Sequence, residues 1–137
     1  WDGALPSPNA VALEGFNLLH AFTQEEKWAE AARAGFAAAL PLAVRNPRGF
    51  MTTARALAGA VEEPAVAVVI GTGDPASLAA WRRALAGPDH AGVLPVYRAA
   101  AAPDSVLGLF AARAARDGRA TLYLCRGRTC EAPRTEP

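Results

Sequence analysis

The two cysteines of this chain stand close together in a segment whose residues are suited to thiol chemistry. Cys125 and Cys130 lie five residues apart in the run ATLYLCRGRTC, residues 120–130. Thiols separated by a short turn can form a disulfide, supply half of a metal site or pack as two small apolar side chains. The state of the two thiols decides whether this segment takes part in a reaction or only supports the fold.

The surrounding residues favour a structural pair over a metal site or a redox centre. Zinc sites need four ligands, and the only histidines, His20 and His90, lie far from the cysteines in the sequence, so we expect no metal. The spacing also differs from the C-x-x-C of thiol oxidoreductases, which favours a static disulfide or two packed thiols. A redox pair is the alternative, because Arg126 and Arg128 can lower the pKa of a nearby thiol.

The segment Gly71-Thr72-Gly73-Asp74 is a second candidate, because it follows an apolar run and opens a helical pattern. Phosphate groups bind at such places in parallel sheets. The segment lacks the third glycine of the dinucleotide fingerprint and the lysine of the P-loop, and a carboxylate at Asp74 would repel a phosphate. We therefore expect a tight turn with Asp74 as the helix N-cap, and no bound cofactor.

The composition is that of one ordinary folded domain. The chain has 137 residues, of which 52% are hydrophobic and 20% charged, and its net charge is +1. Such a charge gives no reason to expect nucleic acid or an anionic membrane as a partner. There is no apolar run of about 20 residues and no signal-peptide pattern, so we expect a cytoplasmic protein. The chain opens at Trp1 without a methionine, which suggests a piece of a longer protein.

Before Pro64 the pattern is helical. Ser7-Pro8 predicts a helix start with Ser7 as N-cap, and this first helix should end near residue 23. A second helix, over about 24–40, carries a stripe of small and aromatic residues at three- and four-residue steps, and Pro41 should end it. A third helix is expected over 48–61. Its predicted inner face consists of Phe50, Met51, Ala54, Leu57, Ala58 and Val61.

After Pro64 the pattern alternates between strands and helices. Strands are predicted at 65–70, 92–98 and 120–125, with Pro95 marking the second as an edge strand. One helix should follow Asp74. Another should begin near residue 104 or 105 and end at Asp117-Gly118. We therefore expect a mixed α/β fold: a helical segment at 1–63, a small three-stranded parallel β-α-β-α-β unit at 64–131, and a frayed tail at 132–137.

Two segments together resemble a known family. DGALPSPNAVA, residues 2–12, and ATLYLCRGRTCEAP, residues 120–133, resemble the C-terminal part of large thioredoxin-domain-containing proteins of the spermatogenesis-associated type. Proteins of that family have a thioredoxin-like domain, a helical toroid similar to six-hairpin glycosidases and sugar epimerases, and a C-terminal α/β portion. The resemblance covers essentially the whole chain. It implies that residues 1–63 are the closing hairpins of the toroid.

The resemblance also gives the polar residues near the start of the chain a candidate role. It implies that the loop before Ser7 lies at the mouth of the toroid, where Asp2, Ser7 and Asn9 could hydrogen-bond a polyol. Glycosidase chemistry needs two carboxyl groups flanking one bond, and only Asp2 is placed for it. From the residues themselves, we expect Ser7 to cap the first helix while Asp2 and Asn9 shape the turn.

We therefore expect a C-terminal structural and interaction portion of a larger thioredoxin-domain protein, without enzymatic activity of its own. One alternative is that it contributes part of a carbohydrate-binding or sugar-processing site. The other is that it is a thiol redox partner of the thioredoxin-like domain. The expected partner is the upstream part of the same protein, and the isolated chain should form homodimers through its uncovered apolar helix faces.

Overall fold

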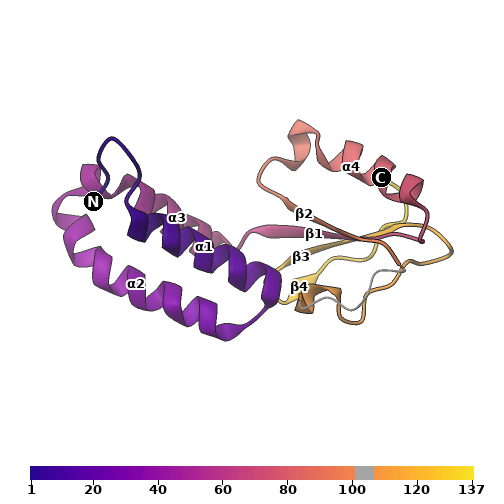
Figure 1. Cartoon of the computed structure of the whole chain (residues 1–137), viewed down its shortest axis with the longest axis horizontal. Coiled ribbons are helices and arrows are strands. Elements are labelled where there is room, and N and C mark those ends of the chain that lie inside the picture. Colours follow the sequence, from indigo (N-terminus) through magenta and orange to yellow (C-terminus); the bar gives the residue numbers. More distant parts are fainter. Residues whose placement is uncertain (101–106) are drawn as a thin grey trace. The chain divides into compact units, whose positions relative to one another are not determined.

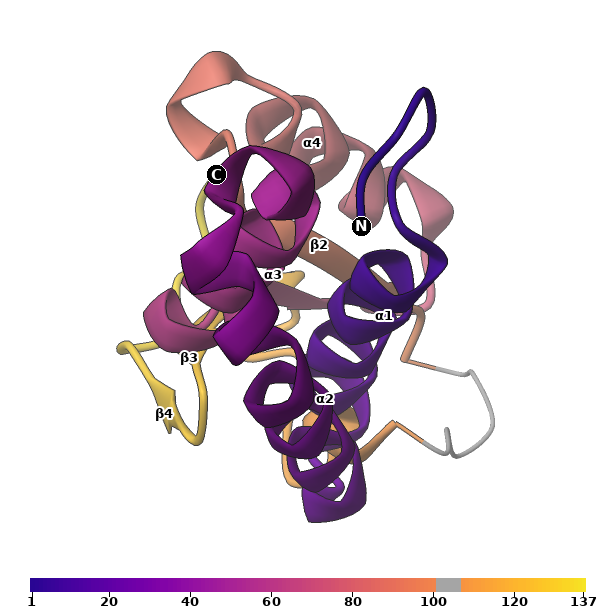
Figure 2. The same cartoon turned by 90° about the vertical axis from the view of Figure 1, so that its left-hand side faces the viewer.

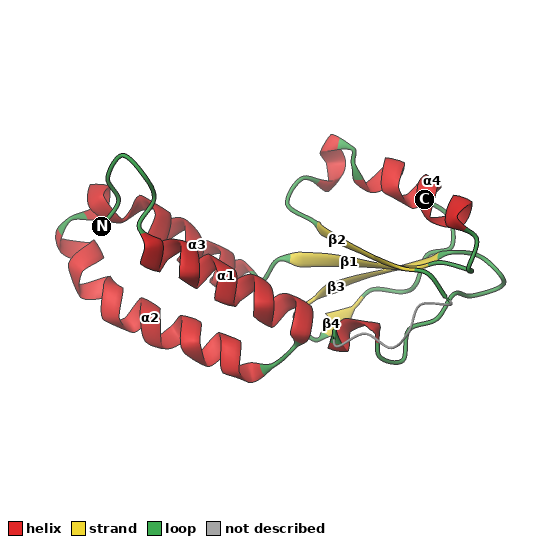
Figure 3. Cartoon of the chain, viewed as in Figure 1, coloured by secondary structure: helices red, strands yellow, loops and turns green. Residues whose placement is uncertain are grey.

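The chain has a mixed α/β fold divided into two compact units, Trp1–Glu63 and Pro64–Pro137 (Figure 1). The computed structural model describes residues 1–100 and 107–137. No helix within these residues is long and apolar enough to cross a membrane. Figure 3 shows that the first unit is helical and that the second combines a sheet with helices.

The helical unit contains α1 (Pro8–Thr23), α2 (Glu26–Arg45), the 3-10 turn η1 (Pro47–Phe50) and α3 (Met51–Glu62). Helix α1 packs against both α2 and α3 (Figure 1 and Figure 2). The predicted bounds of the first helix are confirmed, with Ser7 at the N-cap and Pro8 at the first helical position. The prediction that Pro41 ends the second helix is wrong. Helix α2 continues for four more residues at the cost of one backbone hydrogen bond.

The core of the helical unit is small and depends on a close approach of α1 and α2. The predicted stripe on α2 is confirmed, since Ala32 and Phe36 are buried and Trp28 is half-buried against Phe16, with ring centroids 5.9 Å apart. A Cβ atom added at Gly35 would lie 2.4 Å from the side chain of Leu13 on α1. The absence of a side chain at this position therefore lets the two helices touch.

The predicted inner face of α3 is wrong in most of its residues. Helix α3 buries Thr53 and Ala56, with Leu57 and Ala60 packed beside them. Met51 and Val61 are 64% and 76% exposed, and Ala54 and Ala58 are also exposed. The helix has two apolar faces, and periodicity alone cannot tell which of them contacts α1. The face chosen from the sequence is the one left uncovered.

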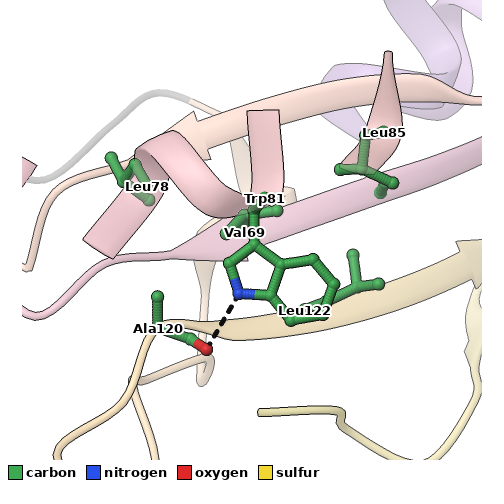
Figure 4. Close-up of a cluster of buried hydrophobic side chains, with 7 residues drawn as sticks. Val69, Leu78, Trp81, Leu85, Ala120 and Leu122 are labelled. Atoms are coloured by element: carbon green, nitrogen blue, oxygen red, sulfur yellow. Dashed lines mark hydrogen bonds between the residues drawn. The ribbon is translucent and has the colours of Figure 1, made fainter. Parts of the chain in front are cut away.

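The α/β unit is built around β1 (Ala65–Ile70), which is buried along its whole length as predicted. It also contains α4 (Pro75–Leu85), the 3-10 turns η2 (Pro88–His90) and η3 (Gly108–Phe110), β2 (Leu94–Arg98), β3 (Thr121–Arg126) and β4 (Thr129–Cys130). Helix α4 lies on one face of the sheet. Figure 4 shows Trp81 over the sheet, with its indole N–H donating to the carbonyl oxygen of Ala120 at 3.1 Å.

The strand order is β2-β1-β3-β4, and the prediction of a three-stranded parallel sheet is wrong. Strand β2 is parallel to β1 and lies at the edge, as Pro95 indicated, but β3 is antiparallel to β1. Thr121, the first residue of β3, pairs with Ile70, the last residue of β1. The chain therefore re-enters the sheet at the end where β2 left it, and a parallel strand would require a crossover to the opposite end.

The helix predicted to make that crossover is not formed in the described residues. Its expected start, at 104 or 105, lies outside them, and from Gly108 onward there is a single 3-10 turn followed by irregular backbone. Asp117 and Gly118, expected to end a helix, both have positive φ, and the backbone N–H of Arg119 donates to the carbonyl oxygen of Arg116 at 2.8 Å. This is the geometry of a two-residue hairpin turn.

The segment after β4 is paired, in contrast to the expected frayed tail. The backbone N–H of Glu131 donates to the carbonyl oxygen of Leu124 at 2.8 Å. Arg134 and Leu122 exchange both backbone hydrogen bonds, at 2.8 and 3.0 Å. The second long edge of β3 is therefore occupied by the chain that follows the hairpin.

Candidate functional site

The candidate site lies on the hairpin of β3 and β4, where Cys125 and Cys130 are joined by a disulfide. The two residues pair across the hairpin, and their Cα atoms are 3.9 Å apart. The turn between the strands has only two residues, Gly127 and Arg128, and Gly127 has a φ of 53°. Glycine suits this positive φ in a tight hairpin, so the Arg-Gly-Arg sequence brings the two cysteines opposite each other.

The face of β3 that carries Cys125 is opposite the one covered by α4. Leu122 and Ala120 belong to the cluster under α4, and side chains alternate along a strand. Tyr123 and Cys125 therefore point to the other face, where the backbone of residues 108–116 passes. The hydroxyl of Tyr123 donates to the carbonyl oxygen of Ala114 at 2.8 Å, which ties that segment to the sheet.

Arg113 brings a cation to the disulfide. Its Nη2 lies 3.1 Å from Sγ of Cys130 and 3.6 Å from Sγ of Cys125. Its Nη1 donates to the carbonyl oxygen of Leu109, which holds the guanidinium in place. Burial lowers the pKa of Arg113, because the charged form loses hydration, but an arginine side chain still stays protonated at neutral pH.

Arg113 was not predicted from the sequence, because it lies 12 and 17 residues from the two cysteines. The arginines expected to act on the thiols were Arg126 and Arg128, next to them in sequence. Arg126 follows Cys125 directly and so points to the opposite face of β3, where it is exposed. The available signal was Asp117-Gly118, which predicts a hairpin and hence the return of residues 108–116 toward β3.

Asp2 and Ser7, proposed as polyol ligands, are joined to each other by a hydrogen bond. The carboxylate of Asp2 accepts the backbone N–H of Ser7 at 2.9 Å and that of Thr52 at 2.7 Å. These hydrogen bonds lower the pKa of Asp2, and the one from Thr52 has the larger effect. Ser7 is buried and its side chain makes no capping hydrogen bond, while Asn9 is exposed on the first turn of α1. Both carboxylate oxygens of Asp2 thus already have backbone donors.

The Gly71–Asp74 segment forms the turn that the sequence predicts. Asp74 caps α4 by accepting the backbone N–H of Ala76 at 2.9 Å, and Ser77 Oγ donates to the carbonyl oxygen of Asp74 at 2.6 Å. An open pocket of about 310 Å³ lies beside it, with Thr72 and Arg119 in its lining. Arg119 is paired with Glu136 at 2.9 Å, so its charge is already compensated.

Within residues 1–100 and 107–137, no three histidine, cysteine or acidic side chains lie close enough together to hold a metal ion. Comparison of the chain with protein-family models, with curated proteins and with solved structures finds no match.

Proposed function

We propose that this chain is a structural and interaction portion of a larger protein, in which the outer face of the helical unit packs against further helices of the same protein. The resemblance to thioredoxin-domain proteins of the spermatogenesis-associated type supports the same proposal, because the helices of an α/α toroid have neighbours on both sides.

One observation carries this proposal. In the part of the chain that the structure describes, every exposed large apolar side chain belongs to the helical unit. They are Trp1, Leu5, Val11, Leu18, Leu19, Leu40, Leu42, Val44, Met51 and Val61. Scattered apolar side chains are normal on a protein surface, but their confinement to one unit is not.

Pairs of exposed residues on each helix follow the helical repeat, whereas Trp1 and Leu5 precede α1 and Leu42 lies on the opposite side of α2 from Leu40 and Val44. On α1, Val11 and Leu18 are seven residues apart, and on α2, Leu40 and Val44 are four apart. On α3, the exposed Met51 and Val61 fall on the face that the sequence assigned to the core. Each helix therefore has a second apolar face besides its contact within the unit, as expected for helices with neighbours on both sides.

Met51 is the only methionine of the chain and 64% exposed, which makes it a site-specific probe. At concentrations low enough to prevent self-association, we expect hydrogen peroxide to oxidise Met51 in the 137-residue chain about as fast as in the urea-unfolded chain. In the intact gene product that contains this sequence, oxidation should be at least about tenfold slower, because other helices cover the residue. Equal rates in the intact product and the unfolded chain would exclude the proposal.

The isolated chain provides a second measurement. With its outer faces uncovered, it should self-associate at micromolar concentration in sedimentation velocity experiments. The double variant Leu18→Gln and Val61→Gln should shift it toward monomer, while Arg83→Gln, at an exposed position of α4, should not. A wild-type chain that is wholly monomeric would contradict the expectation that these faces bind other helices.

A further inference from the structure

We propose that Cys125 and Cys130 form a reversible dithiol–disulfide couple, in which a dithiol reductant attacks Cys130 and Arg113 stabilises the thiolate that leaves from Cys125. This inference goes beyond the interaction role of the helical unit and does not depend on it.

Arg113 places a positive charge beside the disulfide without an anionic partner among the described residues. The side chain is half-buried, and within residues 1–100 and 107–137 no carboxylate is paired with it. Charges removed from water are normally paired with an opposite charge. The guanidinium here faces a neutral disulfide, whose sulfur atoms are weak hydrogen-bond acceptors. Reduction would place a thiolate within 3.1–3.6 Å of Nη2, and so supply the guanidinium with an anionic partner.

Among the residues that the structure describes, the other groups around the sulfurs do not offset this cation. The hydroxyl of Tyr123, on the same face of β3, is engaged with Ala114. Glu131, next to Cys130 in sequence, is exposed and paired with Arg134 at 2.6 Å. Arg126 and Arg128 add positive charge near the hairpin, and the carbonyl oxygen of Tyr123 lies 3.8 Å from Sγ of Cys125. Nη2 of Arg113, at 3.6 Å, is nearer to Sγ of Cys125 than that carbonyl oxygen is, so the local field favours thiolate.

The two cysteine residues are also unequally exposed. Cys125 is 4% exposed in the interior of the sheet, whereas Cys130 is half-buried on the short outer strand β4. We therefore expect an external thiolate to attack Cys130 rather than Cys125. Attack at Cys130 makes Cys125 the leaving group, and a leaving thiolate that is stabilised by a cation departs faster.

The reaction balances with a dithiol as reductant. One thiolate of the reductant attacks Sγ of Cys130 and forms a mixed disulfide, while the electron pair of the broken bond leaves on Sγ of Cys125. The second thiol of the reductant, after losing its proton to solvent, attacks its own partner sulfur and releases Cys130, which takes up a proton. The reductant loses two electrons as a cyclic disulfide, and the protein gains two.

The test uses the full oxidised chain, with dithiothreitol as the reductant and alkylation followed by mass measurement as the readout. At pH 7 we expect Arg113→Gln to slow reduction about tenfold, and Arg113→Lys to restore most of the rate. Arg116→Gln is the matched control, because Arg116 lies on the same segment but contacts the ring of Tyr123 at 5.9 Å. It should change the rate by no more than about twofold.

A titration of the reduced wild-type chain gives a second readout that does not depend on whether Arg113→Gln folds. Alkylation rates against pH should show one thiol with a pKa at least about one unit below that of free cysteine. In single-cysteine variants, the Cys130 of Cys125→Ser should react with oxidised glutathione faster than the Cys125 of Cys130→Ser. Resistance of the native disulfide to dithiothreitol, two thiols with ordinary pKa values, or equal rates for Arg113→Gln and Arg116→Gln would each overturn the proposal.

Discussion

The carboxylate of Asp2 accepts backbone N–H groups at the starts of two helices. One belongs to Ser7, the N-cap of α1, and the other to Thr52, in the first turn of α3. Backbone N–H groups in a first helical turn have no acceptor within their own helix, and a negative charge there is favourable. Asp2 thus holds the backbone at both helix starts, but in α1 it accepts the N–H of Ser7 itself and not the first-turn N–H groups that the hydroxyl of Ser7 was expected to cap.

Replacing Asp2 by Asn should lower the thermal midpoint of the helical unit at pH 7, because an amide oxygen can replace only one of the two acceptors. The pKa of Asp2 is lowered in the folded state, mainly by the hydrogen bond from Thr52. This stabilisation is therefore complete above the pKa of the unfolded chain and is lost as the pH falls through the folded pKa. The difference between wild type and variant, followed by circular dichroism, should shrink below about pH 4. Asp89→Asn, at an exposed position, should show no such difference.

Trp81 and Trp28 form a natural pair for measuring one buried hydrogen bond. The indole N–H of Trp81 donates to the carbonyl oxygen of Ala120, whereas that of Trp28 is buried without a partner among the described residues. Trp81→Phe should cost about 1–3 kcal/mol more than Trp28→Phe in urea unfolding, because it leaves a buried carbonyl without its donor. Equal costs for the two substitutions would mean that this hydrogen bond adds nothing to stability.

At the scale of elements, the sequence predicts best where local chemistry and burial agree. The bounds of α1 follow from Ser7-Pro8, and β1 follows from an apolar run that suits burial on both faces. Predictions fail where a distant contact decides. Helix α2 tolerates Pro41, and α3 turns its other apolar face inward. The hydrophobic periodicity of the sequence does not indicate the direction of β3, because that direction depends on where the chain re-enters the sheet.

The same limit applies to the candidate site. The sequence predicts that the two cysteines lie close together, because a short turn separates them. It does not predict Arg113, because its contact with the sulfurs needs residues 108–116 to fold back over β3. The hairpin turn at Asp117-Gly118 places the preceding segment near β3. It does not indicate which side chain of that segment contacts the sulfurs.

The contact between α1 and α2 can be tested at Gly35. Gly35→Ala should destabilise the helical unit by about 1–3 kcal/mol, because the added methyl group would overlap the buried side chain of Leu13. Gly59→Ala is the control, since Gly59 lies inside α3 with nothing within 4 Å of an added Cβ. That substitution should stabilise the helix by about 0.5–1 kcal/mol. A stabilising effect at both positions would show that α1 and α2 can separate freely.

At the scale of the whole molecule, the two units differ in how many large apolar side chains they bury. Leu13 and Phe36 are the large apolar side chains buried in the helical unit, whereas β1, β3 and α4 together bury many more. Because stability rises with buried apolar area, the α/β unit should be the more stable of the two in the isolated chain.

Hydrogen exchange in increasing urea should therefore show two steps. At concentrations low enough to prevent association, amides of α1, α2 and α3 should exchange by unfolding at lower urea than those of β1 and β3. Leu122→Ala should move the second step by about 2–5 kcal/mol and leave the first in place, because its side chain belongs to the cluster under α4. A single step shared by all five elements would mean that the units unfold together.

The pairing of residues 131–134 with β3 also bears on solubility. The outer edge of β3 would otherwise offer free backbone donors and acceptors beside an apolar sequence, which is the arrangement that recruits strands from other molecules. Arg134 occupies that edge opposite Leu122, and Pro133 beside it cannot donate a backbone hydrogen bond to an incoming strand. The polar segment after the hairpin thus covers the strand edge at which fibril-like association would begin. We expect variants that shorten this segment to aggregate before they show any other defect.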